Sequence, residues 1–429
     1  MLDIKLIREN PHIVENDLIK RGEKEKIKML KDLLEFDKEY RNNLQKLEKL
    51  RHKKNVLSVE IAKLRKEGKD VKEKLKEGER ISKEIKILEE KVRNLKEKID
   101  SILLKLPNLL HESVPIGKDE TENVEIRKWG EPPKFDFEPK SHLEILKNLG
   151  LIEEERAEKV SGRGFFYLKG PLVLLDFAIM RYAIDHLIKK GYILIEPPFM
   201  IRKKPYMGVT DLEFFHDQLY KIENEDLYLI ATAEHPLASM FMNEVLNKDD
   251  LPIKLVGVSP CFRKEVGTHG KYTKGFFRMH QFNKVEQFIF CLPENSWEMH
   301  EELQKNSEEL YQGLGLHYRV VNVCTGDIGS IAAKKYDIEV WMADGKYREV
   351  GSNSNCTDYQ ARRLNIRYRE KEGQAPKGFV HTLNNTALAT SRTMIAIIEQ
   401  YQQSDGTVLI PKVLWPYMNG IKKLEPLNL

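Results

Sequence analysis

The sequence predicts an α+β protein in which a long antiparallel coiled-coil hairpin of helices precedes a mainly antiparallel β-sheet flanked by helices. Three observations predict this fold. Apolar residues from Ile81 to Ile102 recur in steps of four and three, the pattern of a coiled-coil helix. The proline-bearing segment 106–117 ends that helical part. After it, short β-rich runs alternate with helical stretches, which is typical of a sheet with flanking helices.

The hairpin is expected over residues 27–105, inside a first domain of residues 1–112. Its first helix has an irregular apolar seam, interrupted around Arg51 to Lys54, and a polar turn, KEGKD, follows at 66–70. Two helices of about 35 to 40 residues would form an arm roughly 50 to 60 Å long at ~1.5 Å per residue. The pattern alone leaves open a coiled coil used for dimerisation. The second helix carries an unbroken heptad seam of Ile81, Ile85, Leu88, Val92, Leu95, Ile99 and Ile102.

Positive charge is concentrated in this first quarter of the chain. Residues 1–110 carry 30 lysines and arginines against 22 aspartates and glutamates, a net charge of +8, which leaves −4 for the remainder. A polyanion is the partner that this charge favours, although helices rich in lysine and glutamate are often only solvated. The cations expected near the tip are Arg51, Lys53, Lys54, Lys63, Arg65 and Lys66.

The second domain is expected over residues 113–429. A linker, WGEPPKFDF, opens it, and helices are predicted at 296–314 and 390–402. The runs that predict strands are DLYLIATA, IKLVGVSPCF, FFRMHQFNKVEQFIF, YRVVNVC, YDIEVWMA and YREVGSNSN.

Composition limits the class of protein. Hydrophobic residues make up 41% of the chain and charged residues 32%, no apolar run approaches the ~20 residues of a membrane span, and the N-terminus lacks a signal-peptide core. We therefore expect a cytoplasmic protein with no membrane partner. The four cysteines are far apart without a CxxC pair, so buried thiols are expected rather than a zinc site.

The segment FRKEVGTHGKYTKGFFRMHQF, residues 262–282, suits a nucleoside triphosphate. Arg263 closes one strand-like run and Phe282 lies in the next; guanidinium groups grip phosphate oxygens and an aromatic face stacks on a base. Small residues before Arg392 in NNTALATSRTMIAI allow close approach of a ligand. Neither GxxxxGK[ST] nor GxGxxG is present, so the common phosphate-binding folds lose their main support. The basic loop of 262–282 carries Gly267, His269, Gly270, Lys271, Lys274 and Gly275.

These segments resemble the three motifs of class II aminoacyl-tRNA synthetases. GYILIEPPFM, with Pro198, resembles motif 1 (about 174–200), the arginine-bearing segment motif 2 (about 258–288), and TALATSRTMIAI motif 3 (about 382–402). TAEHPL, HQFNKVEQF and REVGSNSNCTDYQARRLNIRYR narrow the resemblance to the seryl-tRNA synthetases. The resemblance covers the whole chain and implies a class II catalytic domain in the second half.

The resemblance implies a site for ATP with Mg²⁺. Arg263 would bridge the α-phosphate and the serine carboxylate, and Arg278 and Arg392 would face the terminal phosphates; these three are the expected catalytic residues. Phe282 and Arg392 would sandwich the adenine, and Glu265 would accept from its amino group. Without the other motifs, a helix of small residues with one arginine, such as that of motif 3, usually serves only to pack the core. The implied ATP set is Arg263, Lys264, Glu265, Arg278, Met279, Phe282, Glu349, Val350, Gly351, Ser352 and Arg392, of which Glu349 and Ser352 are the implied Mg²⁺ ligands.

L-serine is the implied amino acid. Serine differs from alanine by one hydroxyl, so only buried groups that need this hydroxyl can reject alanine by a factor of ~10⁴. The division of the amino and hydroxyl contacts stays open. His235 departs from the family pattern and is expected to be structural, and Asn385 stands where glycine is common. The implied serine set is Thr232, Ala233, Glu234, Arg263, Glu286 and Thr386.

The remaining partners follow from the same resemblance. The arm would bind tRNA(Ser), with tRNA(Sec) left open, because an RNA helix is recognised by shape and backbone. A homodimer is expected through the GYILIEPP strand. The alternatives are a relative that charges a carrier protein, which would lack the arm, and a non-catalytic paralogue, which would lose charge from motifs 2 and 3.

Overall fold

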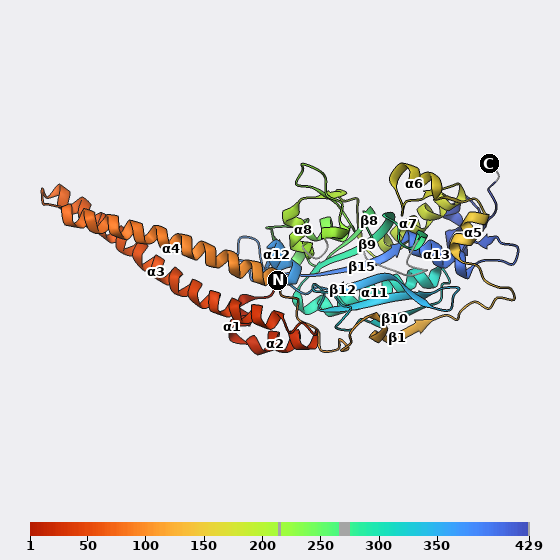
Figure 1. Cartoon of the computed structure of the whole chain (residues 1–429), viewed down its shortest axis with the longest axis horizontal. Coiled ribbons are helices and arrows are strands. Elements are labelled where there is room, and N and C mark those ends of the chain that lie inside the picture. Colours follow the sequence, from red (N-terminus) through yellow and green to blue (C-terminus); the bar gives the residue numbers. More distant parts are fainter. Residues whose placement is uncertain (213–215, 266–274, 428–429) are drawn as a thin grey trace. The chain divides into compact units, whose positions relative to one another are not determined.

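The computed structural model describes residues 1–212, 216–265 and 275–427, and these divide into two compact units, Met1–Pro107 and Asn108–Leu429 (Figure 1). None of the helices in the described part combines the length and the apolar character that crossing a membrane needs. Five residues of the predicted basic loop lie outside the described residues: Gly267, His269, Gly270, Lys271 and Lys274.

The first unit is helical, and α3 and α4 run side by side over their length (Figure 1). Their facing seams are buried in one apolar cluster that includes Leu57 and Ile81. Gly68 in the connecting turn has a φ of 67°, a conformation that glycine adopts without strain. The predicted coiled-coil hairpin is confirmed, and the 41 residues of α3 make it about 60 Å long at ~1.5 Å per residue. The helices are α1 (Ile4–Glu9), α2 (Pro11–Lys20), α3 (Lys26–Lys66) and α4 (Lys72–Lys105).

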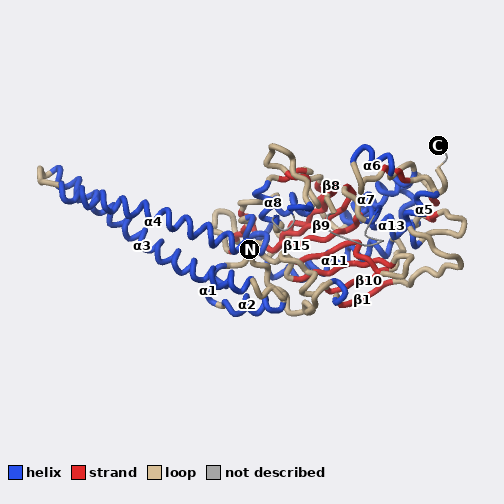
Figure 2. The backbone as a smooth tube through the Cα atoms, viewed as in Figure 1, coloured by secondary structure: helices blue, strands red, loops and turns tan. Residues whose placement is uncertain are grey.

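The second unit is built on an eight-stranded sheet (Figure 2). All neighbouring strands in it are antiparallel except β4 and β8, so the predicted α+β fold is confirmed. Across the sheet the order is β1 (Val124–Trp129), β10 (Tyr318–Asn322), β11 (Lys334–Trp341), β12 (Tyr347–Asn355), β15 (His381–Ala389), β9 (Gln281–Cys291), β8 (Ile253–Phe262) and β4 (Ile193–Ile195).

Helices and small sheets surround this sheet. The helices are α5 (His142–Asn148), α6 (Glu155–Ser161), α7 (Pro171–Lys189), α8 (Lys203–Val209), α10 (Glu234–Ser239), α11 (Ser296–Gly313), α12 (Tyr359–Leu364) and α13 (Thr390–Gln400). The small sheets pair β2 (Ile152–Glu153) with β3 (Tyr167–Leu168), β5 (Met200–Ile201) with β6 (Tyr228–Leu229), β16 (Val408–Leu409) with β17 (Lys423–Leu424), and β13 (Arg367–Arg369) with both β7 (Val245–Asn247) and β14 (Gly378–Phe379). Short 3₁₀ turns lie at Glu120–Glu122, His216–Gln218, Lys248–Asp250, Gly275–Phe277, Pro293–Asn295 and Lys412–Met418.

The central strand β9 explains where the sheet is covered and where it is open. On one face, Val285, Ile289 and Cys291 are fully buried in the main apolar cluster, to which α7, α11 and α13 contribute. On the other face, Phe288 and Phe290 pack into a second cluster with Leu237 of α10. The same face is polar nearer the start of β9, and there it borders two cavities.

Two segments differ from the sequence-based expectation. Residues 276–280 were predicted as strand, but Phe276 and Phe277 form a 3₁₀ turn because both rings enter the main cluster together. β1 was not predicted as a strand. Its sequence VEIRKW alternates apolar and polar residues from Val124 to Arg127, but all six residues are exposed at the sheet edge, so the strand has no buried face.

Candidate active site

Polar side chains gather on the open part of one sheet face. Successive side chains of a strand point to opposite faces, so residues two apart share a face. Lys284 and Glu286 therefore lie together on β9, and Thr386 of β15 pairs with Glu286 in the register. Asn384 follows on the same face and pairs with Ser354 of β12. Three strands that are far apart in the sequence thus contribute to one polar surface.

A β-bulge brings Glu349 and Ser352 to the same face, although their odd spacing would normally separate them. On β11, Asp337 pairs with Ser352 and Glu339 with Glu349, so two residues on β11 match three on β12. A bulge re-aims the side chains of the strand that contains the extra residue. The Ser352 hydroxyl donates to Glu349 Oε1 at 3.3 Å. The two residues expected to bind Mg²⁺ are therefore adjacent.

A small cavity of about 50 Å³ gathers most of the residues expected to bind ATP. The Arg263 guanidinium lies 5.3 Å from the Phe282 ring centre, and that of Arg392 lies 4.8 Å from Phe277. A Cβ at Gly351 would lie 3.1 Å from the Thr386 carbonyl oxygen, so glycine allows this close approach. The expected residues in the lining are Arg263, Glu265, Met279, Phe282, Glu349, Val350, Gly351, Thr386 and Arg392.

Carboxylates hold two of the three predicted catalytic guanidinium groups. Arg278 donates to Glu265 Oε2 at 2.9 Å, and Glu265 has a φ of 50°, a left-handed conformation that is uncommon for residues other than glycine and is often found at functional sites. Arg392 donates to the Glu349 carbonyl at 2.8 Å and lies 3.4 Å from its carboxylate. Burial would raise the pKa of Glu349, but Arg392 and the neighbouring cations lower it to about 2, so the carboxylate is ionised.

A larger cavity of about 390 Å³ adjoins the first, and Arg263 lines both. Thr232, Glu234 and Ser352 also line it. Ala233, by contrast, is buried in the apolar cluster below α10. The Lys264 ammonium lies 5.6 Å from the Tyr220 ring centre and lines neither cavity. The residue shared by both cavities is therefore the arginine expected to bridge the two substrates.

A buried ion pair on β9 adjoins the small cavity, which Lys284 lines. Lys284 and Glu286 are 5% and 1% exposed, and Lys284 Nζ lies 2.5 Å from Glu286 Oε2. The Thr386 hydroxyl donates to the same oxygen at 3.3 Å. Removing one partner of such a pair would leave an uncompensated buried charge. The Lys284 ammonium therefore offsets the charge of the Glu286 carboxylate inside the protein.

Glu234 is the second buried carboxylate of this region. Its Oε1 accepts from Gln360 Nε2 at 3.0 Å and from Asn384 Nδ2 at 3.2 Å. Burial and then the charge of Glu286 raise the pKa of Glu234 to about 7. Burial lowers the pKa of His235 well below its usual value, and its ring packs 4.6 Å from that of Tyr206. His235 is therefore a neutral packing residue, in agreement with the structural role expected for it.

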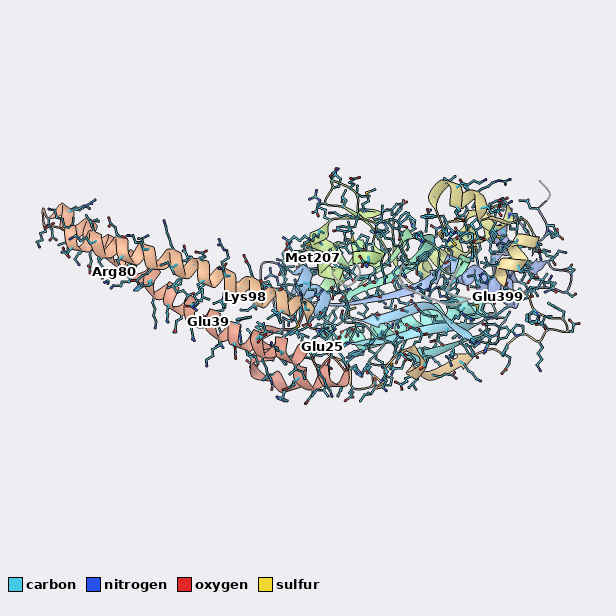
Figure 3. All side chains as sticks on the ribbon, viewed as in Figure 1. Glu25, Glu39, Arg80, Lys98, Met207 and Glu399 are labelled. Atoms are coloured by element: carbon cyan, nitrogen blue, oxygen red, sulfur yellow. The ribbon has the colours of Figure 1, made fainter. Side chains whose placement is uncertain are left out.

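The six arm cations fall into two groups. Arg51 and Lys53 bridge from α3 to α4, each 2.7 Å from a carboxylate, Glu89 and Glu77 respectively. These ion pairs occupy the stretch where the apolar seam of α3 is interrupted. Figure 3 shows charged side chains projecting from both helices, with Glu39, Arg80 and Lys98 labelled. Lys54, Lys63, Arg65 and Lys66 are exposed and form no ion pair within the described residues.

Lys284, Asn384, Gln360 and Lys335 are among the polar residues of the site that were not predicted. A signal existed for the first two, because each lies two residues from a predicted site residue on the same strand and therefore on the same face. Gln360 of α12 and Lys335 of β11 reach the site only through tertiary packing, which no local pattern indicates.

Two family models match the chain. The model described as "Seryl-tRNA synthetase N-terminal domain" matches residues 1–110. The model described as "tRNA synthetase class II core domain (G, H, P, S and T)" matches residues 218–401.

Full-length relatives match as well. The serine–tRNA ligase of Thermococcus sibiricus is 53% identical over all of this chain and 98% of its own length. The crystal structure of the seryl-tRNA synthetase from Pyrococcus horikoshii, complexed with ATP, has 53% identity, a TM-score of 0.94 and full coverage of both chains. The cytoplasmic serine–tRNA ligase from Naegleria fowleri, in complex with AMP, has 40% identity and a TM-score of 0.88, with coverage of 100% and 99%.

Proposed function

The chain belongs to the seryl-tRNA synthetase family, whose activity is serine–tRNA ligation, and we propose that ATP activates L-serine at the open face of its sheet for transfer to the 3′ end of tRNA(Ser). One observation supports this placement above others. Arg263 lines both cavities, so a single guanidinium borders the place where two anionic substrates would meet. In this assignment the small cavity receives part of ATP and the larger one receives serine.

Activation brings a serine carboxylate oxygen in line with the α-phosphorus of ATP, and pyrophosphate leaves. Two anions repel each other, so fixed positive charge at their junction lowers the barrier. Arg263 supplies it, while Arg278 and Arg392 take the terminal phosphates. On ATP binding, Arg278 and Arg392 would exchange their contacts with the carboxylates of Glu265 and Glu349 for contacts with phosphate oxygens. The Glu265 carboxylate, released from Arg278, could then accept a hydrogen bond from the adenine amino group.

Mg²⁺ fits beside Glu349 and Ser352. Their oxygens lie 3.3 Å apart, and the buried Oδ1 of Asp337, which pairs with Ser352, accepts no hydrogen bond within the described residues. Hard oxygen donors that leave room for water suit this ion. We assign Glu349 and Ser352 as its protein ligands; when bound, the ion would neutralise charge on the leaving pyrophosphate.

Serine selection rests on the buried carboxylates. Glu286, paired with Lys284, and Glu234 provide carboxylates for the serine ammonium, and the Thr386 and Thr232 hydroxyls provide small polar partners. An alanine substrate would leave such buried groups without a partner, which penalises its binding more than lost contact area does. The division of contacts among these four residues remains a prediction.

A homodimer is proposed through the free edge of the sheet. β4 is the last strand of the sheet, and its residues Ile193 and Leu194 are 57% and 45% exposed. Phe177 on the neighbouring α7 is 55% exposed. A second copy that pairs along this edge would bury this apolar patch. Binding of the tRNA to the arm, service of tRNA(Sec) and a cytoplasmic location remain predictions.

ATP–pyrophosphate exchange tests the proposed chemistry most directly. Exchange should require L-serine and Mg²⁺, and glycine, alanine and threonine should each support it poorly. Charging of tRNA(Ser) in the same preparation then separates a ligase from a relative that charges a carrier protein. Equal exchange with alanine would contradict the assignment of the buried polar groups, and no exchange with any amino acid would favour a non-catalytic paralogue.

A further inference from the structure

The larger cavity has more room than serine needs. Even if each of the seven non-hydrogen atoms of serine occupied as much space as a water molecule, roughly 30 Å³, serine would fill only about 210 Å³. The cavity measures about 390 Å³. Beyond Thr232, Glu234 and Arg263, it continues to a wall made of the backbone and side chains of residues 328–332.

Lys335 also lines this cavity and has no role so far. It pairs with Ser354 in the register of β11 and β12, and both residues border the cavity. Lys335 does not line the small cavity that holds the residues expected to bind ATP. Its cation therefore lies on the side of the reaction centre that is shared with serine.

The Lys335 side chain is 18% exposed, and its ammonium is loosely held. It donates to the Asp327 carbonyl at 3.4 Å and lies 3.6 Å from the Asp337 carboxylate, both longer than the 2.7–3.2 Å typical of such bonds. Burial alone would lower the pKa of Lys335, but Asp337, Glu349 and Asp327 raise it above its usual value. An ammonium has three donors, so this cation retains capacity for an anionic ligand.

We propose that Lys335 and the wall of residues 328–332 form a subsite for the 3′-terminal nucleotide of tRNA, with the ammonium binding its phosphate. This inference rests on the ligase activity described above. The second step requires a terminal ribose hydroxyl to reach the seryl-adenylate carbonyl carbon. There the ester bond forms, the bond from that carbon to the phosphate oxygen breaks, and AMP leaves with the electron pair while its phosphate oxygen takes the hydroxyl proton. Ile331 offers apolar contact for a base, and Lys335 gives the nucleotide a fixed orientation.

The test compares Lys335→Gln with Lys334→Gln. Lys334 is the adjacent lysine on the opposite face of β11, with its ammonium 4.8 Å from the Tyr336 ring centre, so it serves as a matched control. Seryl-adenylate is formed on each enzyme, and transfer to tRNA(Ser) is followed in a single turnover. Lys335→Gln should slow transfer about tenfold or more, the effect of losing one charge-assisted hydrogen bond. Because Lys335 lines the cavity assigned to serine, pyrophosphate exchange is measured for every variant, and in Lys335→Gln transfer should fall at least about fivefold more than exchange does.

Binding provides a second readout. tRNA(Ser) that lacks its terminal adenosine nucleotide competes with intact tRNA; the unmodified enzyme and Lys334→Gln should prefer the intact molecule, and Lys335→Gln should lose that preference. Equal loss of exchange and transfer would overturn the proposal and assign Lys335 to adenylate formation. Unchanged transfer would overturn it as well. If Lys335→Gln is unstable because Asp337 loses its partner, Lys335→Gln/Asp337→Asn is compared with Asp337→Asn, which removes both charges of the pair.

Discussion

The division of the arm cations predicts that four lysines and arginines govern the salt dependence of tRNA binding. Replacing Lys54, Lys63, Arg65 and Lys66 with Gln removes exposed cations without ion-pair partners in the described part of the arm. Each phosphate contact contributes about 0.7 to 0.9 to the slope of log affinity against log salt, so the slope should fall by roughly 3. Between 50 and 200 mM salt, the unmodified protein should therefore lose roughly 60-fold more affinity than the variant.

The matched control is Arg51→Gln/Lys53→Gln. These two cations already neutralise Glu89 and Glu77. If they moved to phosphates, both glutamates would take up counterions, and little net release would remain. The slope should therefore change by less than about 0.5 for the pair. Fluorescence anisotropy with labelled tRNA(Ser) measures both slopes. Equal effects per residue in the two variants would refute the reasoning, and exchange activity reports on folding in each.

Three further predictions concern the catalytic unit. Arg263→Ala should lower pyrophosphate exchange at least about 100-fold, because a preorganised group that stabilises transition-state charge is worth ~2.7–4 kcal/mol; retained exchange in a folded variant would refute the motif 2 assignment. Because the pKa of Glu234 is raised to about 7, its carboxylate is protonated at lower pH, so KM for serine should rise as pH falls below 7, and Glu234→Gln should flatten that profile. Sedimentation should detect a dimer, and Leu194→Glu on β4 should produce monomers; a stable active monomer of the unmodified chain would contradict this prediction.

Most of the fold was predictable because its signals are periodic. The heptad seam from Ile81 to Ile102 stays on one side of a helix whatever surrounds it, and it is the seam of α4. The predicted strands that became β8, β11 and β12 are longer than the edge strand β1, which has six residues, all of them exposed. The conformation of an edge strand such as β1, or of a turn such as Gly275–Phe277, depends on the residues that pack against it, and these residues are distant in the sequence.

The site was only partly predictable for a related reason. Motif resemblance located Glu349 and Ser352, but period-two alternation alone would have placed them on opposite faces. Only the bulge opposite Ile338 and Glu339 brings them together. Lys335 illustrates the converse: no motif marked it, yet the register places it opposite Ser354 on the same face as the predicted residues. Strand register, which sequence patterns describe poorly, therefore decides which charges meet at the reaction centre. The comparison of Lys335→Gln with Lys334→Gln tests this conclusion, because the two lysines are adjacent in sequence but lie on opposite faces of β11.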